Sequence, residues 1–239
     1  MITTKLSRAG FLKSIVALCA VALTTLPVFS DEKPAGRWEK DIHAFEMQDA
    51  TNPPPQSAVL FIGSSSIRMW KSLPQAFPEV KVINRGFGGS EISDSVHFAD
   101  RIVIPYHPKM IVLHAGGNDI NAGKSPERVL ADFKDFVTTV RAALPETRIA
   151  FVSINPSPKR AVQLEKQRKA NALIRDYVPT VPNCEFIDIV DALLDKDGNP
   201  REDLVIADKL HPNAEGYKIR ADIIRPHLAW LAAGANAKP

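Results

Sequence analysis

The chain has 239 residues, of which 45% are hydrophobic and 24% charged, a composition that suits one globular domain or, less easily, two small ones. Its formal net charge is +3 at pH 7, but residues 1–30 hold three basic and no acidic side chains, so the remainder carries 3 − 3 = 0. A neutral remainder gives no reason to expect nucleic acid or an anionic membrane surface as a partner.

Residues 1–30 are expected to be an export signal. A basic start is followed by a short apolar stretch, and Val28 and Ser30 are the small residues that a cleavage site before residue 31 requires. The apolar stretch is short and interrupted for a membrane span, and an uncleaved anchor is the alternative. We therefore expect residues 31–239 to form a single exported domain, periplasmic or secreted, without stable membrane association after cleavage.

The cysteines exclude an internal disulfide in the exported part. Cys184 is the one cysteine beyond the signal, and its apolar neighbours indicate a small core residue. No Cys-x-x-Cys or His-x-x-x-His pair suggests a metal site, so we expect neither a metal nor a cofactor.

The predicted elements begin with a helix over residues 37–50, in which Trp38, Ile42 and Phe45 recur near helical spacing. Short apolar runs then follow, and they are continuous rather than alternating, as in strands that are covered on both faces. These five predicted strands are residues 58–62, 80–84, 109–115, 148–154 and 184–189.

Helical patterns lie between the later strands. Ser125 and Pro126 are typical of a helix cap and first helical position, and a charged helix is expected over residues 158–177. The last helix contains Pro226, which should kink it. Because strands and helices alternate, the expected fold is α/β, with a parallel sheet between two layers of helices.

Polar, Gly-rich segments follow the first three strands, at residues 63–66 (GSSS), 84–90 (NRGFGGS) and 115–119 (AGGND). A fourth polar segment, residues 208–217, leads into the last helix. A serine-rich turn is an ordinary way to end a strand. Open parallel sheets, however, bind ligands beyond the carboxyl ends of their strands, so four such segments at one edge favour a functional site.

The residue types in these segments meet the needs of serine catalysis. A serine hydroxyl requires a base within hydrogen-bond reach, and the base requires an orienting group. Asp208 and His211, three residues apart, can supply both. Backbone N–H groups of the serine turn and of residues 86–90, together with the Asn118 amide, are candidate donors to an oxyanion.

Taken together, the segments resemble the SGNH (GDSL) hydrolase family. GSSS resembles its first block, with Ser64 where the family usually has Asp, and this implies that Ser65 is the nucleophile and one oxyanion donor. The stretch GSSS-I-R-x-W, preceded by a helix that contains Trp, resembles a particular branch of the family.

The other blocks assign the remaining site residues by the same resemblance. NRGFGGS resembles the second block and implies that Gly89 donates to the oxyanion, and GGND resembles the third and implies the same for Asn118. DKLHP resembles the fifth block, with Asp208 and His211 as the catalytic acid and base. The blocks span about 150 residues in the family's order.

The resemblance implies a flavodoxin-like, three-layer α/β/α fold with five parallel strands in the order 2-1-3-4-5. It implies a serine ester hydrolase that acts without a cofactor. Residues 1–30 add the expectation of export, and the short, polar segments at the sheet edge favour short-chain, acetyl-type esters of a small-molecule or glycan substrate. A dedicated deacetylase of O-acetylated glycans and a non-catalytic carbohydrate-binding module are the alternatives. The oligomeric state stays open.

Neighbouring residues carry lesser expectations. Gly86 and Gly88 should serve only the dihedral angles of their turn, and His114 should be a hydrogen-bonded core histidine rather than a second base. Trp70 has two interpretations, a wall of the active-site cleft or a core residue.

Overall fold

The structure is a computed structural model that describes residues 1–2 and 35–235. Contacts divide the chain into Met1–Lys33 and Pro34–Pro239, and the account below concerns the second unit. The expected export signal and its cleavage site fall, apart from the first two residues, outside the described residues, so export stays a prediction. No helix of the described part is long and apolar enough to cross a membrane.

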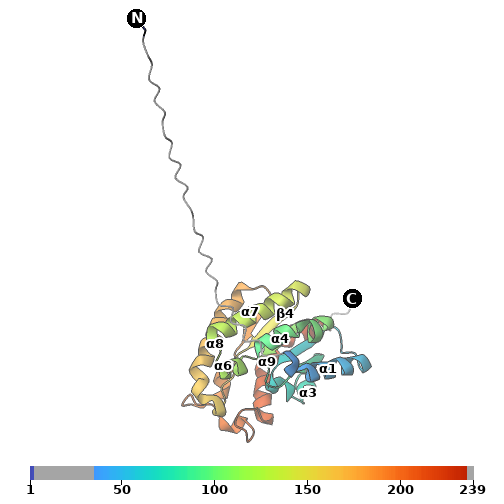
Figure 1. Cartoon of the computed structure of the whole chain (residues 1–239). Coiled ribbons are helices and arrows are strands. Elements are labelled where there is room, and N and C mark those ends of the chain that lie inside the picture. The colour runs from blue at the N-terminus through green and yellow to red at the C-terminus, as the bar shows by residue number, and fades with distance from the viewer. Residues whose placement is uncertain (3–34, 236–239) are drawn as a thin grey trace. The chain divides into compact units, whose positions relative to one another are not determined.

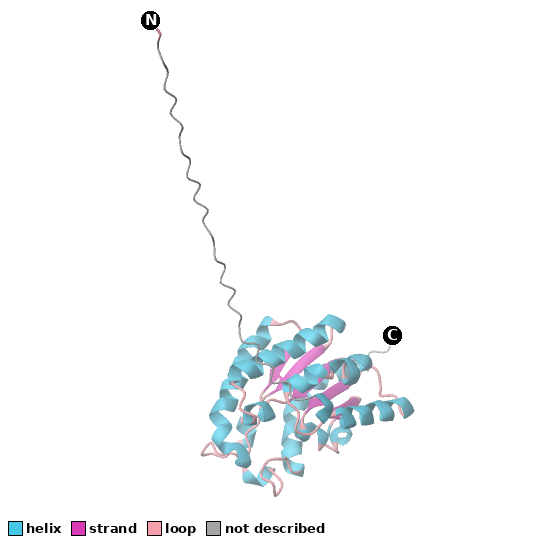
Figure 2. Cartoon of the chain, viewed as in Figure 1, coloured by secondary structure: helices cyan, strands magenta, loops and turns pink. Residues whose placement is uncertain are grey.

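A single parallel sheet forms the centre of the domain (Figure 2). Its strands lie in the order β2-β1-β3-β4-β5, which confirms the predicted order and fold class. The strands are β1 (Val59–Gly63), β2 (Val82–Gly86), β3 (Met110–His114), β4 (Arg148–Val152) and β5 (Cys184–Ile187). Each begins and ends within three residues of its predicted bounds, because buried apolar runs mark the middle of a strand better than its ends.

The register of the sheet brings the Gly-rich segments to one edge. Gly63, the last residue of β1, is paired with Gly86 of β2 on one side and with His114 of β3 on the other. The three strands therefore end level with one another, and the segments that follow them start from neighbouring points.

Helices cover both faces of the sheet, and Figure 1 shows α4, α7 and α8 on one side of it. That face packs through residues such as Leu60 and Leu113 against Ile42, Phe136 and Ile174. The helices of this layer are α1 (Glu39–Thr51), α4 (Ile92–His97), α5 (Ala99–Ile102), α7 (Pro126–Ala143) and α8 (Leu164–Tyr177).

The opposite face packs against α2 (Ser65–Arg68), α3 (Leu73–Ala76) and α9 (Ala214–Ala235). Phe61 and Val112 point to this side and lie among Ile67, Leu73 and Ile224. The remaining short helices are η1 (Ala35–Arg37), η2 (Ile104–Tyr106), α6 (Gly117–Asn121), η3 (Pro158–Gln163), η4 (Val178–Thr180), η5 (Asp191–Leu193) and η6 (Glu202–Leu204).

The predicted cap of α7 is confirmed. Ser125 has an extended backbone, and its hydroxyl accepts a hydrogen bond from the N–H of Arg128 at 3.2 Å, while Pro126 takes the first helical position. The cap satisfies one of the N–H groups that a helix leaves without an internal acceptor.

The prediction of one helix over residues 158–177 is wrong at its start. Pro158–Gln163 is a 3₁₀ segment in which Arg160 has non-helical dihedral angles (φ −119°, ψ 23°), and α8 begins only at Leu164. Two tertiary contacts hold this turn: the N–H of Lys159 donates to the carbonyl of Lys209, and the Arg160 guanidinium bonds Asn118. Such contacts override helix propensity.

Candidate active site

The nucleophile candidate lies at the turn that leaves β1. Ser65 is the first residue of α2, and Ser64 before it has the extended backbone of a helix N-cap without a capping bond from its side chain. The Oγ of Ser65 lies 2.7 Å from Nε2 of His211, and this is hydrogen-bond distance. The structure therefore brings together two residues that the sequence places far apart.

His211 is held from its other side by Asp208. The distance from His211 Nδ1 to Asp208 Oδ2 is 2.5 Å, and the second carboxylate oxygen accepts the backbone N–H groups of Leu210 and His211 at 2.9 and 3.0 Å. A carboxylate on Nδ1 favours the tautomer that carries its proton there, so Nε2 is left to accept the proton of a serine hydroxyl.

The same contacts keep Asp208 ionised. Burial acts to raise the pKa of its carboxyl, but the hydrogen bonds from the His211 ring and from the N–H groups of His211 and Leu210 outweigh burial and lower the pKa to about 2. Asp208 is thus charged throughout the pH range in which the enzyme is expected to work.

The oxyanion candidates are arranged around Asn118. Ser65 is the first residue of its helix, so its N–H has no acceptor within that helix. The Asn118 amide donates to the carbonyl of Ser90 at 2.9 Å, which ties it to the loop of Gly89. Ser65 and Asn118 line one pocket, whereas Gly89 lies in the adjoining loop and is not part of the pocket wall.

Two of the three glycines in residues 86–89 do not have the role expected of them. Gly89 has φ of +80°, a conformation that favours glycine, whereas Gly86 and Gly88 have no positive φ. A Cβ on Gly86 would lie 2.2 Å from the backbone nitrogen of Arg68, and one on Gly88 would lie 2.7 Å from the Arg68 guanidinium carbon. The expectation that Gly86 and Gly88 serve only dihedral angles is wrong, because neither has a positive φ. Gly86 permits the backbone of α2 to pack closely against it, whereas the neighbour of Gly88 is the flexible end of a side chain.

A buried ion cluster, which sequence reasoning missed, includes Asp119, the residue that follows Asn118. Lys124 Nζ lies 3.0 Å from Asp119, 2.6 Å from Asp132 and 2.9 Å from Glu91. The fully buried Asp119 also accepts the N–H of Ile92, and burial raises the pKa of its carboxyl to about 6 despite Lys124. The cluster therefore joins the segment of Asn118 to the loop that begins α4.

His114 and Trp70 are both core residues. His114 is buried at the end of β3, its Nε2 lies 3.0 Å from Asn155 Oδ1, and burial lowers its pKa to about 4. It is therefore a neutral, hydrogen-bonded histidine, as expected. Trp70 is 2% exposed and packs on Phe61 and Tyr217, so the core interpretation holds.

The pocket at Ser65 is a cavity of about 40 Å³ with a largely polar wall. Besides the predicted residues, Ser157 and Arg160 contribute to it from the segment after β4. The sequence offered only a weak signal for them, a polar, Pro-rich stretch at the end of a strand. Within the described residues no cluster of three His, Cys, Asp or Glu side chains is arranged to hold a metal.

Comparison with known proteins gives consistent matches. The signature of the GDSL-like Lipase/Acylhydrolase family matches residues 61–219. Platelet-activating factor acetylhydrolase IB subunit alpha1 of Bos taurus is 27% identical over 196 residues, which cover 78% of this chain and 80% of the relative.

Two solved structures share the fold. A GDSL-like lipase from Bacteroides thetaiotaomicron aligns with a TM-score of 0.68 at 19% identity, over 80% of this chain and 98% of that one. A catalytic mutant of an acetylxylan esterase from Geobacillus stearothermophilus aligns with a TM-score of 0.60 at 16% identity, over 73% of this chain and 95% of that one. Since the family signature spans four of the five strands and all the predicted site residues, the chain belongs to the GDSL-like lipase/acylhydrolase family and is an esterase of the SGNH type.

Proposed function

We propose that this esterase removes short acyl groups, acetyl above all, from the hydroxyl of a polar alcohol such as a sugar, and that it does so outside the cytoplasm. The observation that carries the proposal is the chain of contacts from Asp208 through His211 to Ser65 Oγ, which opens into a small polar pocket.

The reaction follows from these contacts in two steps. Ser65 Oγ attacks the ester carbonyl as His211 Nε2 takes the hydroxyl proton. The negative charge that forms on the carbonyl oxygen is stabilised by Ser65 N–H and the Asn118 amide, with Gly89 N–H in the adjoining loop as the third donor that the family resemblance assigns. The intermediate collapses to an acyl-Ser65 ester, and His211 gives its proton to the departing alcohol.

Water completes the cycle. His211 takes a proton from a water molecule that attacks the acyl-Ser65 ester, and the second tetrahedral intermediate returns the serine hydroxyl and releases a carboxylate. Asp208 stays ionised throughout and stabilises the imidazolium that forms in each step.

The preference for a short acyl group is supported by the size and walls of the pocket. The pocket is partly open to solvent, its cavity volume is about 40 Å³, and most of its wall is polar, so it offers little apolar surface to a long acyl chain. Each additional buried methylene contributes about 0.8 kcal/mol only if an apolar surface excludes water from it. The names of two similar proteins, an acetylhydrolase and an acetylxylan esterase, agree with this preference.

A dedicated deacetylase of O-acetylated glycans is the second candidate, favoured by the fold shared with the acetylxylan esterase. A chain-length series of p-nitrophenyl esters, from acetate to palmitate, tests the acyl preference through kcat/KM. The maximum should fall at acetate, and a maximum at eight carbons or more would reject a small acyl pocket. Acetylated xylan and monomeric acetylated sugars, assayed in parallel, distinguish a general esterase from a glycan deacetylase.

A further inference from the structure

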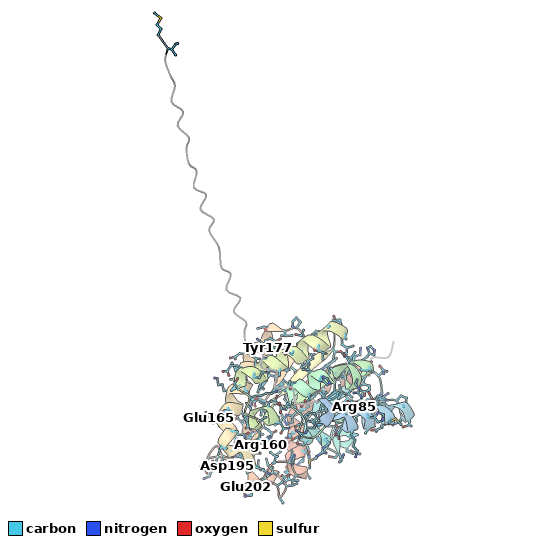
Figure 3. All side chains as sticks on the ribbon, in the orientation of Figure 1. Arg85, Arg160, Glu165, Tyr177, Asp195 and Glu202 are labelled. Atoms are coloured by element: carbon cyan, nitrogen blue, oxygen red, sulfur yellow. The ribbon has the colours of Figure 1, made fainter. Side chains whose placement is uncertain are left out.

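Two polar side chains in the active-site pocket have no part in the two-step reaction. Ser157 and Arg160 both come from the turn after β4, and both line the pocket beside Asn118 and His211. Figure 3 labels Arg160 in the lower half of the domain. We call this pair the Arg160–Ser157 subsite.

The Ser157 hydroxyl is buried and unsatisfied. The residue is 2% exposed, and its Oγ has no hydrogen-bond partner in the part of the chain that the structure describes. A buried hydroxyl without a partner is unfavourable, and native proteins keep few of them. A hydroxyl in this condition on a pocket wall indicates a position for a ligand acceptor.

Arg160 is a partly desolvated cation without an acidic partner. One guanidinium nitrogen donates to Asn118 Oδ1 at 2.9 Å, and no described carboxylate lies within ion-pair distance of it. Desolvation lowers the pKa of its guanidinium, which nevertheless stays charged. With five N–H groups in a planar fork, Arg160 keeps donors for a second acceptor after bonding Asn118.

We propose that the Arg160–Ser157 subsite binds an anionic group, a carboxylate in the first place, on the alcohol part of the ester substrate. The inference rests on the proposed function, because an acetyl group carries no charge and leaves only the alcohol to supply the anion. The substrate class is then an O-acetylated acidic sugar rather than a neutral one.

Charge around the neighbouring loop agrees with an anionic substrate. The Arg68 guanidinium packs against Gly88, and an Arg37 nitrogen lies 3.2 Å from where a Cβ on Gly89 would be. Both arginines are exposed, and neither forms an ion pair within the described residues. Two further arginines without ion pairs among the described residues thus lie against the loop of Gly88 and Gly89, and residues 31–239 carry no net charge.

The test compares three acetylated sugars that differ only at C6. These are methyl O-acetyl-galactopyranoside, the corresponding galacturonoside with a carboxylate at C6, and the galactoside 6-phosphate. The phosphate arm distinguishes a requirement for a carboxylate from a requirement for any oxyanion. Each substrate is compared with itself across enzyme variants, so differences in intrinsic reactivity cancel.

Arg160→Gln should lower kcat/KM about 10–100-fold more for the galacturonoside than for the neutral galactoside, mainly through KM, because a hydrogen bond to a charged group is lost. Any fall common to both substrates reports the contact with Asn118. Lys159→Gln is the matched control, since it removes an exposed positive charge next to the subsite and should leave the ratio of the two substrates unchanged.

Ser157→Ala separates binding from structure. The hydroxyl has no hydrogen-bond partner among the described residues, so its removal should not lower the midpoint of thermal unfolding, yet kcat/KM for the galacturonoside should fall about 2–10-fold. A loss of thermal stability with equal effects on all sugars would show that Ser157 is structural.

Two outcomes overturn the inference while the proposed function stands. Wild-type enzyme that cleaves p-nitrophenyl acetate and all three sugars, with the same fall for each in Arg160→Gln, would reject the anion subsite. A fourth substrate, the neutral galactoside esterified with succinate in place of acetate, carries the anion on the acyl side. Arg160 dependence confined to this hemisuccinate ester would also reject the proposed subsite. Failure of the wild type on p-nitrophenyl acetate itself would reject the proposed function instead.

Discussion

His211 Nε2 lies 2.7 Å from Ser65 Oγ, although 146 positions separate the two residues in the sequence. The contact depends on two independent turns: the one that leaves β1 sets the serine at the start of α2, and the one before α9 carries the histidine. Asp208 lies in the second turn as well, so a single turn holds both the base and the carboxylate that orients it.

This contact predicts that Ser65 is the residue that fluorophosphonates modify. The base activates only the hydroxyl within its reach, so a single adduct should be found by peptide mass spectrometry on Ser65. Labelling should persist in Ser64→Ala and Ser66→Ala and vanish in Ser65→Ala. An adduct on either neighbouring serine of the folded protein would overturn the assignment.

The second prediction concerns the acid and the base. His211→Ala should remove nearly all turnover of p-nitrophenyl acetate. Asp208→Asn should cost less, up to about 10⁴-fold in kcat, since the ring loses its preferred tautomer but keeps its place. EDTA should have no effect, and activity that is lost to EDTA and regained with a divalent ion would contradict this mechanism.

Each segment of this site was predictable because its residues lie close together in the sequence, although the segments themselves are far apart. The continuous apolar runs indicated covered strands, and Asp208 and His211 lie three residues apart. The Arg160 turn was not predictable, because contacts with Lys209 and Asn118, distant in sequence, decide its backbone. The role of Gly86 was hidden likewise, since no local pattern reveals the approach of α2.

Asn118→Ala is the third prediction. Loss of one oxyanion donor should lower kcat about 10²–10³-fold, or roughly 3–4 kcal/mol, with little change in KM. Asn121→Ala, an exposed amide on the same short helix, is the matched control and should keep wild-type kcat. If Asn118→Ala raised KM alone, the residue would be a substrate contact rather than an oxyanion donor.

His114 makes stability depend on pH. Its pKa falls from 6.5 to about 4 on folding because burial disfavours the imidazolium, so the unfolded chain binds the proton more tightly. The stability this provides is present above pH 6.5 and is lost as pH falls towards 4, by roughly 2–3 kcal/mol. Urea unfolding of the wild type and of His114→Gln at pH 7 and pH 4.5 isolates this loss, because Asp119, whose pKa burial raises to about 6, shifts stability in the opposite direction in both proteins.

His114→Gln should lose less stability than the wild type between pH 7 and pH 4.5, because the substituted side chain does not titrate. His97→Gln, at an exposed histidine, should keep the wild-type slope. An unchanged slope in His114→Gln would assign the pH dependence to other groups.

The last prediction tests the buried ion cluster around Lys124. Lys124→Met leaves the buried carboxylates of Asp119 and Asp132 without their shared cation, and should lower the free energy of unfolding by roughly 3–5 kcal/mol at pH 7.5. Lys169→Met, which breaks the exposed pair with Glu127, should cost less than about 1 kcal/mol. Urea unfolding followed by circular dichroism measures both.

The effect of Lys124→Met should shrink at pH 5, because the pKa of Asp119 is already raised to about 6 by burial and its carboxyl can take up a proton instead of remaining charged. An effect of equal size at both pH values would mean that the variant is destabilised by lost packing of the lysine stem rather than by buried carboxylates left without a cation.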